Sequence, residues 1–381
     1  MNFTLTNEQS MIQKAAKEFA KKEVATVAEE IDTTGHYPRR IITSLSELDF
    51  LGMMTSSRFG GIGLSGFEFT TVIEEISAAS AALGVSLAIN GRFAYDISAY
   101  GTDEQKERYL PAHSKGEILG AIAFTEPNGG SNWPVTAQTT ATLDREHYII
   151  NGSKCFTSNA GEADVYIVMA RVNAEKGPMG ISAFIIEKDT PGFTFGKMEN
   201  KFGLRGYPIG ELFFNNCRIP KNNMLGKAGE GFKSFQASAP FTFVSTAAVY
   251  VGIAQAALDA CIQFAKERES IPPLTLSQLE SIQGTVSDMA AEVESSRLLM
   301  QKASTMLGIP DMTPLLAVLK CCQMALKVTG DAVALHGGYG CLQENFANRL
   351  FRDAKTLSLQ ISFDKFKSVV GKRLMDVPLQ G

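Results

Sequence analysis

The chain has 381 residues, of which 45% are hydrophobic and 20% are charged, and its formal net charge is −4. This length is too great for one simple core and predicts two or three packed units. The mild acidity argues against nucleic acid or an anionic membrane as the main partner. We find no apolar run long enough to cross a bilayer, so no membrane partner is expected.

Six cysteines and four histidines are scattered along the chain. The cysteines form no CxxC pair and the histidines have no spacing typical of a zinc site, so we expect no metal. The amphipathic start of the chain lacks the features of a secretory signal. Together these observations predict a reducing, cytoplasmic location.

The first third of the chain is expected to be helical. Residues 6–9 and 102–105 both fit a capping box, in which a hydroxyl residue caps a helix and Gln follows three residues later. Between them, apolar residues recur at helical spacing, as in residues 67–82. We therefore predict an N-terminal α-helical domain over residues 1–119.

The pattern changes near residue 120. Short runs rich in β-branched and aromatic residues, separated by Gly, Pro and Asn, predict a strand-rich middle domain over residues 120–230. The helical period then returns and continues almost to the end, which predicts a C-terminal α-helical bundle over residues 231–381. Helices, then strands, then helices make the expected fold class α+β.

The most informative segment is residues 121–131, AIAFTEPNGGS. A predicted strand ends here in a glycine-rich turn, which lets backbone N–H groups approach an anion closely. By itself such a turn is usually an ordinary loop. Six further motifs follow it in order: NGSKCF, KFGLRG, a strand ending in RIP, LGKAGEGF, HGGYG and RLFRDAK. The ordered set is far more specific than any one motif.

Together these motifs resemble the acyl-CoA dehydrogenase family along nearly the whole chain. The resemblance implies an N-terminal helical domain, a middle β domain and a C-terminal four-helix bundle. It also implies FAD as the cofactor and an acyl-CoA thioester as the substrate. Electron-transfer flavoprotein is the electron acceptor by the same resemblance.

The resemblance also assigns eight residues to the flavin. In the family the first turn holds the flavin and its pyrophosphate, and an aromatic of the second motif covers the isoalloxazine ring. An arginine after a long helix and a later glycine pair reach the FAD of a neighbouring subunit, which implies a homotetramer, or a dimer. The ordinary alternatives are an arginine that only complements a helix dipole and glycines that only cap a helix. The eight residues are Thr125, Gly130, Ser131, Phe156, Ser158, Arg268, Gly337 and Gly338.

The family's catalytic glutamate is absent from both of its usual positions. The family reaction needs a carboxylate in a dry pocket to take a proton from the carbon next to the thioester. The position after RDAK falls on Ile361, and the alternative position on an earlier helix falls on Thr242. The flavin motifs are intact and the replacements are apolar or small, which favours a changed pocket over decay.

Asp96 is the predicted catalytic residue in their place. It belongs to a helix that lines the acyl chain in the family, where other members are generally uncharged. The alternatives are a solvated carboxylate or an ion pair with Arg92, four residues away on the same helical face. A base there would reach a carbon farther from the thioester, which suits a 1,4 elimination from an acyl group already conjugated with the carbonyl. This resembles the cyclohex-1-ene-1-carboxyl-CoA dehydrogenases of anaerobic aromatic and alicyclic acid metabolism.

Two other functions stay open from the sequence. One is a flavin-dependent monooxygenase on the same fold, a branch that also lacks the glutamate. The other is a non-catalytic protein that binds acyl-CoA and FAD. Both predict a different response of the bound flavin to an acyl-CoA.

Overall fold

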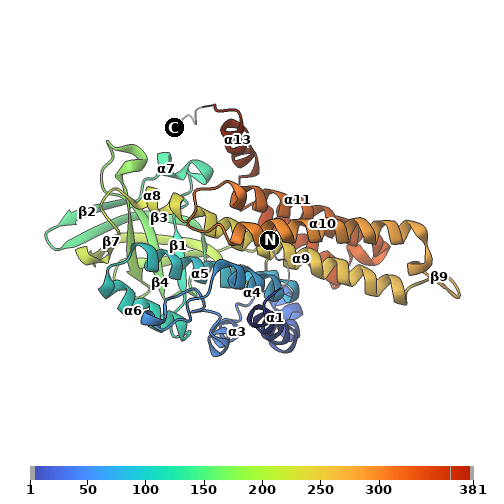
Figure 1. Ribbon diagram of the computed structural model, residues 1–381. Helices are drawn as coiled ribbons and strands as arrows, with labels where there is room; N and C mark the ends of the chain where they lie inside the picture. The colour runs from blue at the N-terminus through green and yellow to red at the C-terminus, as the bar shows by residue number, and fades with distance from the viewer. Residues whose placement is uncertain (1–4, 361, 378–381) are drawn as a thin grey trace.

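The computed structural model describes residues 5–360 and 362–377, and in it the sheet lies at one end of an elongated arrangement of helices (Figure 1). The N-terminal α-helices lie along the lower side of both the sheet and the bundle in this view. A short π-helical segment, Ala20–Val24, joins the first two of them. They are α1 (Asn7–Phe19), α2 (Ala25–Thr34), α3 (Arg39–Ser44), α4 (Gly66–Ala79), α5 (Ala81–Tyr100) and α6 (Asp103–Ser114).

Both predicted capping boxes are present. The hydroxyls of Thr6 and Thr102 each accept a hydrogen bond from the backbone N–H three residues later, and the side chain of the Gln at that position accepts one from the backbone N–H of the capping threonine. These bonds start α1 and α6 at the predicted places. A third capping box, which the sequence analysis did not identify, starts α4 at Ser65.

The middle unit is an eight-stranded sheet in the order β6-β7-β3-β2-β4-β5-β8, with β1 parallel to β4. β4 and β5 are buried along almost their whole length, which explains their continuous apolar sequences. A short helix, α7 (Trp133–Thr136), follows the glycine-rich turn after β1. The strands are β1 (Gly120–Ala123), β2 (Thr140–Asp144), β3 (His147–Ser158), β4 (Val165–Arg171), β5 (Ile181–Glu187), β6 (Phe193–Met198), β7 (Ile209–Pro220) and β8 (Met224–Leu225).

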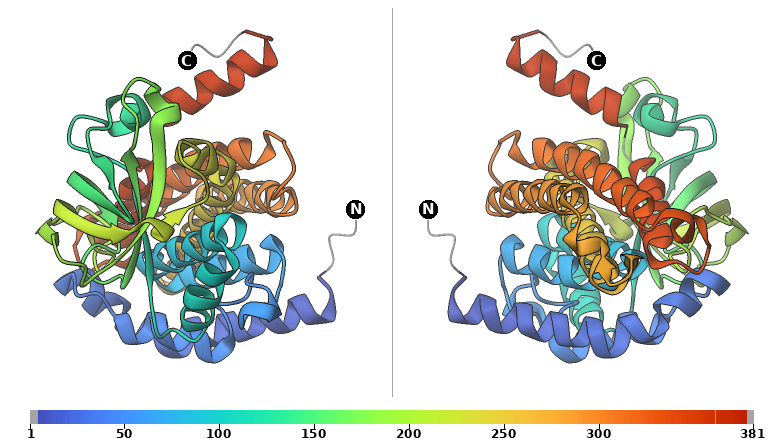
Figure 2. Two further views of the ribbon diagram at one scale, coloured as in Figure 1. Left: turned by 90° about the vertical axis from the view of Figure 1, so that its left-hand side faces the viewer. Right: turned by 90° about the vertical axis from the view of Figure 1, so that its right-hand side faces the viewer.

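The C-terminal unit is a helical bundle that extends away from the sheet (Figure 1). Its central helix, α9, packs against α4, α10 and α11, so the bundle shares one apolar core with the N-terminal helices. The last helix, α13, projects away from the bundle in every view (Figures 1 and 2). The elements are α8 (Gly231–Ala237), α9 (Ala239–Glu267), β9 (Glu269–Ile271), β10 (Leu274–Thr275), α10 (Glu280–Ser304), α11 (Thr313–Leu335), α12 (Phe346–Ser358) and α13 (Phe363–Leu374).

Helix α9 corrects one expectation from the sequence. By length and apolar composition it could cross a membrane, so the statement that no apolar run has that length was wrong. However, 78% of that apolar stretch is buried inside the protein. Burial in the bundle core explains the composition of α9 without a membrane.

A buried cluster joins the three units. Asp32 at the end of α2 accepts two hydrogen bonds from the Arg352 guanidinium of α12, at 2.9 and 2.5 Å. The neighbouring Asp353 accepts from the backbone N–H of Leu204, in the loop between β6 and β7, at 2.6 Å. In the same loop Arg205 donates to backbone carbonyls at the end of α2. The KFGLRG and RDAK motifs therefore hold helices from both ends of the chain against the sheet unit.

Candidate active site

Two of the sequence motifs meet through a buried ion pair. Glu126, just after β1, accepts from Lys154 of β3 at 2.7 Å, and both side chains are almost fully buried. Glu126 also accepts from the backbone N–H groups of Gln138 and Thr139. Burial raises the pKa of Glu126, but the Lys154 ammonium and these donors outweigh it and hold that pKa below its usual value. Burial in turn lowers the pKa of Lys154. The pair holds the segment after β1 against β3.

Thr125, Phe156 and Ser158 lie where the end of β1 meets β3, close to this ion pair. The backbone N–H of Cys155 donates to the carbonyl oxygen of Thr125 at 2.9 Å, so the end of β1 lies beside the last residues of β3. Phe156 has 65% of its surface exposed and a backbone φ of +51°. Such a conformation is uncommon for a bulky residue and is concentrated at functional sites. An exposed ring in this place fits the predicted cover for an isoalloxazine ring.

Gly130 and Ser131 lie on the turn that follows. Gly130 has a φ of +47°, and a Cβ built on it would meet nothing within 4 Å, so a ligand can approach the backbone there. The start of α13 contacts the same turn. Lys365 Nζ donates to the Ser131 carbonyl at 3.0 Å and to Asn132 Oδ1 at 3.3 Å, and the Ser362 hydroxyl bonds to that of Ser131. Open glycine backbone beside a lysine fits an anionic group such as the FAD pyrophosphate.

The other three predicted flavin residues lie at the far end of the bundle. The Arg268 guanidinium, just after α9, lies 5.4 Å from the centre of the Tyr339 ring, beside Gly337 and Gly338. Gly337 has a φ of +58°, and a Cβ on either glycine would meet nothing within 4 Å. The 29 residues of α9 run between the sheet unit and this group, a length of roughly 40 Å (Figure 1). One chain therefore does not place all eight residues on one FAD.

Asp96 lies on α5 and only 4% of its surface is exposed, so the solvated alternative is wrong. The other alternative is observed, because Arg92 Nε donates to Asp96 Oδ2 at 2.9 Å. The second carboxylate oxygen, Oδ1, is buried and has no hydrogen-bond partner among the described residues. Burial raises the pKa of Asp96, and the positive charge of Arg92 and the Ser238 hydroxyl oppose that shift. A buried acceptor without a partner is uncommon and requires an explanation.

Arg92 also connects Asp96 to one of the vacated glutamate positions. Its Nη1 donates to the hydroxyl of Thr242 on α9, and its Nη2 reaches the carbonyl of Phe235 on α8 at 3.4 Å. The guanidinium carbon lies 5.4 Å from the centre of the Phe235 ring. The other vacated position, Ile361, lies outside the described residues. A single side chain therefore separates the predicted base from one former base position.

An aromatic cluster beside this group was missed from the sequence. Its rings contact one another with centroid separations of 4.7 to 5.9 Å, and they connect the glycine-rich turn to α8 and Arg92. The spacing of Phe232 and Phe235, three residues apart, was the signal that they share a helical face. The cluster forms an apolar wall beside the buried charges. Its members are Phe124, Trp133, Phe232 and Phe235.

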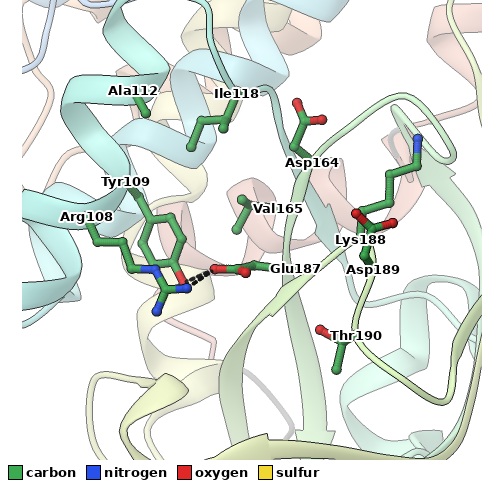
Figure 3. A pocket seen from close by; sticks show the side chains of 10 residues that line it. All are labelled: Arg108, Tyr109, Ala112, Ile118, Asp164, Val165, Glu187, Lys188, Asp189 and Thr190. Carbon is green, nitrogen blue, oxygen red and sulfur yellow. Dashed lines mark hydrogen bonds and ion pairs between the residues drawn. The ribbon is translucent and has the colours of Figure 1, made fainter.

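A separate hollow of about 440 Å³ lies between α6 and the strands β4 and β5 (Figure 3). Within it the Arg108 guanidinium and the Tyr109 hydroxyl both bond to Glu187, at 2.5 and 3.0 Å. None of the residues predicted from the sequence to form the site lines this hollow. The candidate active site is therefore the Asp96 group with the glycine-rich turn, and the hollow is not part of it.

Family comparisons agree over the whole chain. Models described as the N-terminal, middle and C-terminal domains of acyl-CoA dehydrogenase match residues 6–117, 121–217 and 229–360. A similar relative is the acryloyl-CoA reductase (NADH) of Anaerotignum propionicum, 36% identical over 97% of this chain and 95% of its own length.

Solved structures are similar to the same extent. Butyryl-CoA dehydrogenase from Megasphaera elsdenii is 34% identical with a TM-score of 0.95, over 98% of this chain and 100% of that one. A second chain belongs to a structure described as an electron transferring flavoprotein of Acidaminococcus fermentans, studied towards a mechanism of flavin-based electron bifurcation. It is 36% identical with a TM-score of 0.95, over 98% of this chain and 99% of that one.

Proposed function

Because this chain belongs to the acyl-CoA dehydrogenase family of FAD-dependent oxidoreductases, we propose that it dehydrogenates a cyclic, unsaturated acyl-CoA of the cyclohex-1-ene-1-carboxyl-CoA type. The reaction in this proposal is a 1,4-dehydrogenation. Asp96 is the base, and FAD, when bound, supplies the hydride acceptor at its N5.

One observation carries the proposal. Asp96 is a buried carboxylate with one oxygen free of partners among the described residues, and it is linked through Arg92 to Thr242, a position where some family members hold their glutamate. Groups with pKa values perturbed by burial and a charge partner concentrate at active sites. Most buried polar atoms in protein structures have a hydrogen-bond partner. The free oxygen supports a base that awaits a substrate proton.

The chemistry of the proposal follows from conjugation. In a cyclohexene-carboxyl thioester the ring double bond is conjugated with the carbonyl, so the allylic carbon distant from the thioester loses a proton with the charge delocalised onto the carbonyl oxygen. Asp96 Oδ1 takes that proton as the new ring double bond forms. The hydride leaves from the other allylic carbon, and the product is a conjugated diene. The aromatic wall, which contacts Arg92 through Phe235, would exclude water from the transfer.

We also propose that neighbouring subunits share the FAD site. The glycine-rich turn and Phe156 would hold the flavin of their own subunit, while Arg268, Gly337 and Gly338 would reach the FAD of a neighbour. The distance along α9 supports this division of the site. We propose a homotetramer in the cytoplasm, with electron-transfer flavoprotein as the electron acceptor. Mass measurement of the native holoprotein tests the subunit number.

The substrate is tested by anaerobic mixing of the yellow holoprotein with acyl-CoA thioesters while flavin absorbance is recorded. The panel contains a saturated straight-chain, a saturated cyclic and the cyclohex-1-ene-1-carboxyl thioester. We expect the flavin to bleach fastest with the cyclohexene thioester. Equal bleaching by the saturated straight-chain thioester would overturn the 1,4 assignment.

The two alternatives from the sequence predict other outcomes of the same experiment. A flavin-dependent monooxygenase would form an oxygen-containing product only when O₂ meets the reduced flavin. A non-catalytic protein would keep its flavin oxidised with every thioester. The ion pair of Asp96 with Arg92 is the observation that favours the non-catalytic alternative, since it gives the carboxylate a structural partner.

A further inference from the structure

We propose that Arg92 is a positioning residue that orients the Asp96 carboxylate through its bond to Oδ2, so that Oδ1 faces the substrate proton. This inference rests on the proposed function, because it assigns a task to Arg92 only if Asp96 is the base. It concerns a residue that no sequence motif of the chain includes.

Arg92 is held by three helices. It belongs to α5 and is 4% exposed. From α9 the hydroxyl of Thr242 accepts from its Nη1, and from the end of α8 the carbonyl of Phe235 accepts from its Nη2 at 3.4 Å. The Phe235 ring packs against the guanidinium. A planar guanidinium bonded on both amino groups and packed on one face has little freedom to rotate.

This anchorage determines which carboxylate oxygen is free. Arg92 Nε bonds to Oδ2 of Asp96 alone, at 2.9 Å, and not to both oxygens as a bidentate pair would. Oδ1 has no hydrogen bond of normal geometry among the described residues, and the Ser238 hydroxyl is the neighbouring donor that acts on this carboxylate. Holding a base within a small angular range greatly raises the rate of proton transfer, because the proton must approach along a hydrogen-bonding direction.

Few other charged or titratable groups face Asp96. Tyr95 and Tyr100 lie on the same helix, α5. The segment between α8 and α9 contributes the Ser238 hydroxyl, which bonds to Tyr100 at 3.4 Å, and α9 contributes the Thr242 hydroxyl. Arg92 is the only cation among the described residues whose charge acts on this carboxylate. Without it, burial would raise the pKa of Asp96 further, opposed only by the Ser238 hydroxyl.

The charge of Arg92 also suits the step after proton transfer. The proton neutralises Asp96 and leaves a negative charge on the conjugated acyl group until the hydride departs, for which FAD, when bound, would be the acceptor. Arg92 stays positive throughout and offsets that negative charge in a site of low dielectric. The pair of Arg92 and Asp96 is therefore neutral before the reaction, and Arg92 with the activated substrate is neutral during it.

The experiment compares four variants of the holoprotein: Arg92→Gln, Arg92→Lys, Thr242→Val and Asp96→Asn. The rate of flavin reduction by cyclohex-1-ene-1-carboxyl-CoA is measured anaerobically across pH. For Arg92→Gln we expect the acidic limb of the profile to move to higher pH by about 1 to 3 units, the shift that follows loss of an opposite charge at this distance. Arg92→Lys keeps the charge and should keep the limb within about one unit, with a lower rate at every pH.

Thr242→Val is the matched control. It removes one anchor of Arg92 but no charge, so the limb should stay in place while the rate falls a few-fold. FAD content and thermal unfolding of each variant report on folding. If Arg92→Gln does not fold, the double variant Arg92→Gln/Asp96→Asn restores charge balance for the stability comparison, and Arg92→Lys with Thr242→Val carries the test.

The outcomes separate the two proposals. If Asp96→Asn reduces its flavin as fast as the unmodified protein, Asp96 is not the base and the assignment of Arg92 falls with it. If Asp96→Asn is inactive but the limb of Arg92→Gln does not move, only the inference about Arg92 is overturned. A limb that moves equally in Thr242→Val would also overturn it, because a change of packing would then explain the shift.

Discussion

Two buried pairs of arginine and aspartate serve different purposes in this protein. Between Arg352 and Asp32 the guanidinium bonds to both carboxylate oxygens and joins helices that are 320 residues apart in sequence. Between Arg92 and Asp96 one bond joins residues four apart on one helix, and the second oxygen of Asp96 is bare among the described residues. The first pair connects domains, whereas the second leaves an acceptor available.

The two pairs differ in whether both oxygens of the buried carboxylate accept hydrogen bonds. Desolvation makes any buried carboxylate costly, and only complete hydrogen bonding offsets that cost. The Arg352–Asp32 pair meets this condition with the bidentate geometry that suits two planar groups. The Arg92–Asp96 pair does not meet it among the described residues, and our proposal assigns the missing partner of Asp96 to the substrate.

The largest expected effect is on chemistry at Asp96. Asp96→Asn removes the base while keeping the shape of the side chain, so we expect flavin reduction by the cyclohexene thioester to slow by about a thousandfold, or about 4 kcal/mol of activation free energy. Stopped-flow absorbance measures it, and FAD should remain bound. Asp32→Asn is the matched control, and its rate per bound flavin should change by less than about twofold. Equal rate losses in both variants would contradict a catalytic role for Asp96 that Asp32 does not share.

The next effect is on stability at Asp32. Asp32→Asn leaves the buried Arg352 with an incomplete partner, so we expect the free energy of unfolding to fall by about 3 kcal/mol. Denaturant unfolding at one fixed protein concentration measures this. Asp331→Asn, which breaks an exposed pair with Lys327 on α11, should cost less than about 0.5 kcal/mol. Similar losses in the two variants would contradict the importance given to burial.

A third buried group, His113 on α6, extends the comparison. Neither ring nitrogen of His113 has a hydrogen-bond partner in the described part of the chain. Burial lowers the pKa of His113 to about 4, from an ordinary value of 6.5. As pH falls below about 6.5 the unfolded chain binds a proton that the native imidazole cannot, so native stability decreases by up to about 1.4 kcal/mol per pH unit until the pH approaches 4.

Thermal unfolding between pH 7 and 4.5 tests this, with His113→Phe as the comparison. The aromatic replacement keeps a ring beside Phe93, whose ring centre lies 5.6 Å from that of the imidazole. We expect the difference in stability between the two proteins to shift in favour of the variant as pH falls. A difference that is constant with pH would show that the imidazole of the native protein takes up its proton normally.

The smallest expected effect concerns an exposed contact. Lys365 on α13 bonds to the turn of Ser131 and Asn132, where FAD pyrophosphate is predicted to lie. Lys365→Met should weaken FAD binding by about three- to fivefold, because solvent screens an exposed charge, and the loss should shrink at high salt. Equilibrium release of FAD fluorescence measures it. Lys367→Met, exposed on the same helix, is the control and should leave FAD affinity unchanged.

Much of the architecture could be predicted from local sequence. The capping boxes at Thr6 and Thr102 each involve residues three positions apart. The strand and turn patterns extend over about ten residues, so both signals can be recognised from a short stretch of sequence. The apolar composition of α9 was less informative, since a core helix and a membrane helix share it. Only packing against α4, α10 and α11 distinguishes the two.

The sequence by itself determined the family, the α+β fold class and the absence of a glutamate at positions 242 and 361, because ordered motifs and residue identities are local facts. It also identified Arg92 as one alternative partner of Asp96, since side chains four residues apart on a helix lie on the same face. The tertiary structure decided the rest. It showed that Asp96 is buried with one oxygen unbonded among the described residues, and that Arg92 reaches Thr242, 150 residues away. It also placed Arg268 and the glycine pair far from the turn of Gly130. Burial and contacts between distant segments depend on how helices pack, and no short stretch of sequence encodes them.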